Sequence, residues 1–138
     1  MDLSEALFKL MHSVRFNIGQ QVKQLNLDLS PMHFKSLKVI SKIDGCNGQK
    51  LADFLGRDKA QINRLIKELV NQELVIKSDD PNDKRSQLLS LSQQGEDIMS
   101  KFKVLERQTF NNMVQGVDSE QIEQFIEVAN KLRSNISG

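Results

Sequence analysis

Apolar residues recur at three- and four-residue steps along most of the chain, which is the pattern of helices with one buried face. Six stretches show it: residues 3 to about 25, 31 to about 43, 49–55, 59 to about 72, 93 to about 113, and 118–136. Ser30 followed by Pro31 favours a helix start, as does Asp58 before the fourth stretch. Two short apolar runs, about 74–77 and 87–91, are typical of β-strands. The order predicts a mainly α fold with one small β-hairpin.

Two further expectations concern single positions. Phe54 shares an apolar helix face with Leu51, Ala52 and Leu55, so we expect it to be buried. Asp118 and Gln121 have the spacing of a capping box, which predicts that both side chains close the start of the last helix.

Between the two predicted strands the chain reads SDDPNDKRS, from Ser78 to Ser86, and five of these nine residues are charged. Pro81 has no amide proton, and Asp and Asn favour turns, so the stretch is neither core nor helix interior. It predicts a stiff charged loop held out between the strands. Asp83 lies two residues before Arg85 and is expected to hold its guanidinium in one orientation.

The third and fourth helices are joined by the short turn Gly56-Arg57-Asp58, which predicts a helix-turn-helix. In DNA-binding proteins of this kind the second helix enters the major groove. The exposed face of the fourth helix carries Lys59, Gln61, Asn63, Arg64 and Lys67. Gln and Asn side chains can pair with adenine, Arg with guanine, and Lys with phosphate. The alternative interpretation is an ordinary solvated helix face.

A hairpin directly after a helix-turn-helix is the winged variant of this motif. The charged loop then has a use as a wing, with Lys84 and Arg85 reaching the phosphates or the minor groove beside the recognition helix. Asp79 and Asp80 argue for the alternative of a mobile solvated turn, because acidic side chains repel DNA.

The composition excludes several other classes. At 138 residues the chain is expected to form a single domain, 1–138, and its net charge of +1 gives no overall attraction to nucleic acid. We find no catalytic constellation, cofactor motif or metal-ligand spacing, so neither an enzyme nor a metalloprotein is predicted. No apolar run suggests a membrane span or a signal peptide, and the single cysteine, Cys46, fits a cytoplasmic protein with a bystander thiol.

The chain resembles the MarR family of bacterial transcription regulators over essentially its whole length. LADFLGRDKAQINRLIKELVNQELV is similar to the family's helix, turn, recognition helix and following strand. DPNDKRS resembles its wing motif, at Asp83 and Arg85, and LLSLSQQGEDI resembles the end of the wing, with Ser92 and Gly95 in the motif positions. The family usually has glycine where this chain has Glu73, which argues against a left-handed helix cap there.

The resemblance implies a winged helix-turn-helix region at about 31–91 and a homodimer formed by helices at about 3–25 and 93–136. It implies a repressor that binds double-stranded DNA at a near-palindromic operator. It also implies release by a small phenolic or other aromatic effector, bound between the dimerisation helices and the winged region. No individual ligand-binding residue is predicted. The alternative function is a winged-helix protein-interaction module without DNA binding, which the near-neutral charge favours.

Overall fold

Residues 1–25 and 27–137, which the computed structural model describes, contain six helices and one antiparallel hairpin in the predicted order. The elements are α1 (Leu3–Gln24), α2 (Pro31–Lys42), α3 (Gly48–Leu55), α4 (Lys59–Asn71), β1 (Val75–Asp80), β2 (Asp83–Leu91), α5 (Gln93–Met113) and α6 (Ser119–Ile136). None of the helices in these described ranges combines the length and apolar character needed to cross a membrane.

Side-chain caps fix most helix starts. Ser30, Asp58 and Ser92 each accept a hydrogen bond from the amide three residues later, at 3.3, 2.8 and 3.0 Å. The capping box predicted at α6 is wrong, because Asp118 makes no side-chain cap hydrogen bond. This helix start is exposed, so water can satisfy its free amide groups.

The core lies where α2, α3 and α4 pack together. Its fully buried side chains include Phe34, Leu37, Leu51, Ile62 and Leu69. The first half of α5 closes this core, and the rings of Phe34 and Phe102 stack at 4.8 Å. The prediction that Phe54 is buried is wrong, since this side chain is 68% exposed. It lines a cleft beside α1 and α2 instead.

The hairpin is longer than the apolar runs predict. β1 and β2 pair from Val75 opposite Leu91 to Asp80 opposite Asp83, which leaves a two-residue turn at its tip. The predicted charged loop is therefore mostly strand. Backbone hydrogen bonds hold a ladder together without apolar side chains, so the pairing continues where both faces are exposed. At the tip the Asp80 carboxylate accepts a hydrogen bond from the Asn82 amide at 2.9 Å.

The junction between α4 and the hairpin needs a left-handed residue. Glu73 has φ 63° and is the only non-glycine with positive φ in residues 1–25 and 27–137. The expectation drawn from the missing glycine is therefore wrong. The amides of Glu73 and Leu74 bond to carbonyls of the last turn of α4, at 2.9 and 3.0 Å, which over-determines this backbone conformation.

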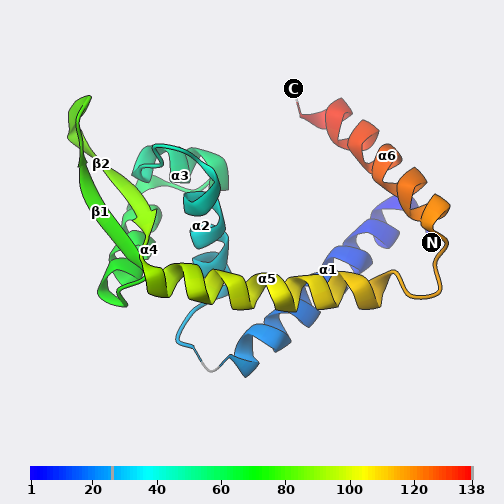
Figure 1. Ribbon diagram of the computed structural model, residues 1–138. Helices are drawn as coiled ribbons and strands as arrows, with labels where there is room; N and C mark the ends of the chain where they lie inside the picture. The colour runs from blue at the N-terminus through cyan, green and yellow to red at the C-terminus, as the bar shows by residue number, and fades with distance from the viewer. Residues whose placement is uncertain (26, 138) are drawn as a thin grey trace.

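Two halves of the molecule lie at opposite ends of α5. Figure 1 shows α2, α3, α4 and the hairpin gathered at one end, while α1 crosses α5 and α6 diverges at the other end, where both termini lie. No residue of α6 in the described part of the chain is buried. The hairpin therefore projects far from the terminal helices.

Candidate nucleic-acid interface

The outward face of α4 carries the residues predicted to read DNA. Ile62, Ile66 and Leu69 anchor the opposite face in the core. All five predicted contact residues on this helix are exposed: Lys59, Gln61, Asn63, Arg64 and Lys67. The anchored face fixes the rotation of the helix, so the polar face is displayed without strain on the fold.

A groove of about 500 Å³ joins the recognition helix to the wing. Lys59 and Asn63 line it from α4, Lys77 from β1, and Asp83 and Arg85 from β2. Three basic side chains and one carboxylate thus face one groove, so its local charge is positive although the chain is almost neutral. The acidic residues near the wing tip, Asp79 and Asp80, do not line it.

Not all predicted contact residues meet in this groove. Gln61 and Arg64 line a second pocket of about 410 Å³ on the other flank of α4, together with Arg57. Lys67 and Lys84 are exposed and line neither cavity. Lys77 was not predicted to be a contact residue, because it lies within an apolar strand run. Only the pairing of the folded hairpin places it in the groove.

The wing is tied to the start of α3 by two hydrogen bonds. The Leu89 amide donates to the Cys46 carbonyl at 2.8 Å. The Asn47 amide group donates to the Ser86 hydroxyl at 3.1 Å, while its oxygen caps α3 by accepting from the Lys50 amide at 2.8 Å. The position of Asn47 directly before a helix indicates its role as a cap. No sequence pattern indicates its hydrogen bond to the wing.

The predicted contact between the Asp83 carboxylate and the Arg85 guanidinium is wrong. Asp83 Oδ1 accepts from the backbone amide of Arg85 at 3.0 Å. Among the residues that the structure describes, no ion pair joins the two side chains. A short side chain reaches a backbone amide two residues away more easily than the end of an arginine. Asp83 therefore shapes the backbone of the wing and leaves the guanidinium exposed for a ligand.

Cys46 lies under this interface and not on it. Its side chain is 1% exposed, and burial raises the pKa of the Cys46 thiol, with Lys50 opposing the shift. Because the thiolate is the reactive form, the raised pKa and the lack of exposure make this cysteine a poor target for oxidation.

A separate cleft of about 620 Å³ lies between α1 and α2, where the resemblance implies an effector site. Its lining includes the apolar residues Val14, Ile18 and Phe102 and the basic residues Arg15 and Lys35. Lys38 and Glu106, which also line it, form an ion pair at 3.2 Å that joins α2 to α5.

Comparison with known proteins agrees with this arrangement. The sequence model of the MarR family matches residues 29–87, which run from just before α2 into β2. MepR from S. aureus, in its complex with DNA, has a TM-score of 0.84 at 19% identity, and the match covers 99% of each chain. A MarR crystal structure has a TM-score of 0.80 at 22% identity, over 98% of this chain and 90% of that chain.

A SlyA-like transcription regulator from Listeria monocytogenes has a TM-score of 0.81 at 23% identity, over 99% of this chain and 89% of that chain. These structural matches cover the terminal helices as well as the winged region, so they establish the winged helix-turn-helix fold for the whole chain. The winged region is therefore similar in sequence to the MarR family, and the whole chain has the winged helix-turn-helix fold of the matched structures.

Proposed function

We propose that this chain is a dimeric, sequence-specific DNA-binding transcription regulator that acts in the cytoplasm. The observation that supports this most is the positive groove shared by α4 and the wing, beside the exposed polar face of α4. A solvated helix face would not require cations from three separate elements to converge. MepR, which has the same fold, was solved bound to DNA.

In this proposal the recognition helix and the wing have different tasks. α4 enters the major groove, where Gln61, Asn63 and Arg64 meet base edges and Lys59 and Lys67 meet phosphates. Arg85, with Lys84 beside it, reaches the minor groove or the flanking phosphates. Asp83 serves by fixing the backbone at Arg85.

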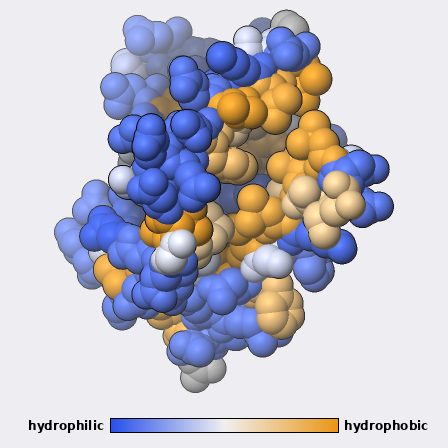
Figure 2. All heavy atoms as spheres, turned by 90° about the vertical axis from the view of Figure 1, so that its right-hand side faces the viewer, coloured by the Kyte–Doolittle hydropathy of each residue, from blue (hydrophilic) through white to orange (hydrophobic). Residues whose placement is uncertain are grey.

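The terminal helices supply the second subunit. Large apolar side chains on α1 and α6 are exposed in the single chain: Leu3, Leu7, Phe8, Phe125, Ile126 and Leu132. Figure 2 shows apolar side chains gathered around a hollow on the face that looks along α5 from the termini. A patch of this kind is typical of an interface. A two-fold dimer would place two recognition helices about 34 Å apart, one turn of DNA, and favour a near-palindromic operator.

The cleft between α1 and α2 is the candidate effector site. Its apolar walls suit an aromatic ring, and Arg15 and Lys35 suit a negatively charged substituent such as a phenolate. The effector would displace α1 relative to the winged region and so change the spacing of the two recognition helices. Repression relieved by such a ligand is the regulation that we propose.

DNA binding is tested with the full chain by selecting duplexes from a random pool and measuring their affinity across a salt series. A regulator enriches one sequence and loses affinity steeply as salt rises. Arg85→Ala should weaken all selected duplexes alike, on the order of tenfold, which is the size of one charge-assisted hydrogen bond. Lys101→Ala removes the same charge from an exposed position on α5 and should change little. No enrichment at low salt would favour the protein-interaction module instead.

Dimerisation is tested by sedimentation of Ile126→Glu. This side chain is 53% exposed, so the substitution leaves the core of the protomer intact. A charge there should convert dimers to monomers and abolish tight binding to the palindrome. Gln124→Glu adds the same charge at an exposed polar position of α6 and is the control. An Ile126→Glu protein that stays dimeric would show that the subunits meet elsewhere.

A further inference from the structure

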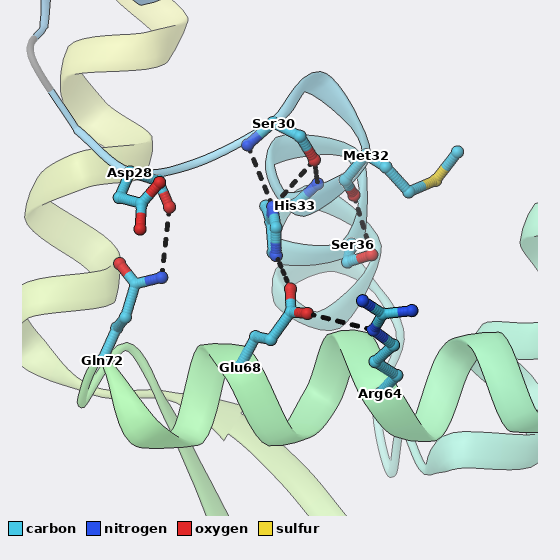
Figure 3. Close-up of polar contacts among 8 residues, drawn as sticks. All are labelled: Asp28, Ser30, Met32, His33, Ser36, Arg64, Glu68 and Gln72. Atoms are coloured by element: carbon cyan, nitrogen blue, oxygen red, sulfur yellow. Dashed lines mark hydrogen bonds and ion pairs between the residues drawn. The ribbon is translucent and has the colours of Figure 1, made fainter.

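A chain of polar contacts links the first turn of α2 to Arg64 on the recognition helix (Figure 3). His33 Nε2 lies 2.6 Å from Glu68 Oε2. The other carboxylate oxygen of Glu68, Oε1, lies 3.5 Å from Arg64 Nε. Glu68 therefore contacts an α2 residue with one oxygen and a predicted base-reading residue with the other.

Ser30 holds the imidazole of His33 on the side away from Glu68. The Ser30 amide lies 2.9 Å from His33 Nδ1, and an amide nitrogen can only donate, so Nδ1 accepts. The ring proton therefore sits on Nε2 and is donated to Glu68. His33 also belongs to the capping box that begins α2, and its side chain is only 11% exposed. A buried ring with both nitrogens bonded has little freedom to rotate.

Glu68 transmits this constraint to Arg64. The arginine side chain is 84% exposed, and a solvated arginine normally samples many rotamers. Because Nε is the atom that faces Glu68, the two terminal Nη groups remain free to donate. These are donors that can pair with O6 and N7 of guanine. Figure 3 shows the outer guanidinium nitrogens beyond the atom that contacts Glu68. An arginine held in one orientation loses less entropy when it binds.

We propose that Glu68 and His33 are positioning residues that restrict the Arg64 guanidinium and thereby sharpen its choice of base. This rests on the proposed function, since it requires α4 to enter the major groove. Neither residue touches DNA in this proposal. Glu68 acts through Arg64, and His33 acts through Glu68.

The rival explanation is that the same contacts only tie α2 to α4. The structure offers a matched control for it, because Gln72 Nε2 at the end of α4 donates to the Asp28 carbonyl at 3.2 Å. This bond also joins α4 to the segment that leads into α2, but it does not involve Arg64. Gln72→Ala therefore removes a tie and leaves the guanidinium alone.

The test uses two duplexes. The first has the sequence that the wild-type protein prefers. The second differs from it at one base pair, the one for which Arg64→Ala loses the preference. The ratio of the two Kd values measures discrimination. Glu68→Ala should lower this ratio about 2- to 10-fold, the cost of ordering one flexible side chain. His33→Gln should do the same, because glutamine can keep the capping box but is too short to hold Glu68 in place.

In the Arg64→Ala background, Glu68→Ala should change the ratio no further, and Gln72→Ala should leave it unchanged. Equal losses on both duplexes, an effect that persists without Arg64, or a higher ratio in Glu68→Ala would each overturn the inference. If Arg64→Ala alters no base preference, the inference falls while the DNA-binding function stands. If the wild-type protein prefers no sequence, both fall.

Discussion

Replacing Gly95 with alanine tests the close approach of α5 to the residues that lead into the wing. A Cβ at this position would lie 2.2 Å from the Leu74 carbonyl oxygen and 3.2 Å from its carbon. Real Cβ atoms essentially never come within 3.0 Å of such a neighbour. Both contacts are backbone atoms, so no side chain can rotate away, and the start of α5 must move by about 1 Å.

That movement strains two hydrogen bonds at the same junction. The Ser92 amide donates to the Leu74 carbonyl at 3.0 Å, and the Ser92 hydroxyl donates to the Glu73 carbonyl at 2.5 Å. Each contributes about 1 kcal/mol net, and overpacking costs about 1–3 kcal/mol. The higher helix propensity of alanine offsets about 1 kcal/mol of this cost. The expected loss in the free energy of unfolding is about 2–4 kcal/mol, a large part of the stability of an ordinary domain.

Urea denaturation at one fixed protein concentration measures this loss, because the stability of the proposed dimer would depend on concentration. Gly19→Ala is the control: a Cβ there meets nothing within 4 Å inside α1, so it should stabilise by up to about 1 kcal/mol. A Gly95→Ala protein with wild-type stability would refute the reasoning, since it would mean that α5 begins farther from Leu74.

Three further predictions concern the junction, the wing and the thiol. Glu73→Gly should raise the free energy of unfolding by about 0.5–1 kcal/mol, because glycine adopts φ 63° without the Cβ penalty; urea denaturation checks it, and a loss would contradict it. Asp83→Ala should weaken binding to all duplexes less than Arg85→Ala does, since it frees only the wing backbone; equal or greater loss in mobility shift would point to a direct role. Peroxide should leave DNA binding of the wild-type protein and Cys46→Ser equally intact, because burial raises the pKa of the Cys46 thiol; oxidation-dependent release of the wild type alone would refute this.

The sequence by itself determined the order of the elements and the outward face of α4. Caps at Ser30, Asp58 and Ser92 act within four residues, and helix periodicity places a face without knowledge of its partner. The exposed residues of α4 were therefore predicted correctly as a set. Their individual roles at base or phosphate stay predictions.

Tertiary structure decided what depends on neighbours distant in the chain. His33 meets Glu68 across 35 residues, and Asn47 meets Ser86 across 39, so no local pattern encodes either pair. Phe54 follows the same periodicity as buried residues, but it is exposed because its side of α3 faces an open cleft.

The left-handed turn at Glu73 has the same origin. A local rule asks for glycine there, yet hydrogen bonds from the end of α4 and from Ser92 hold the backbone in place. A conformation that costs about 1 kcal/mol locally persists here because the end of α4 and Ser92, at the start of α5, both hold it by hydrogen bonds. Short-range energies select helices and caps, whereas the geometry of the site depends on which surfaces the folded chain brings together.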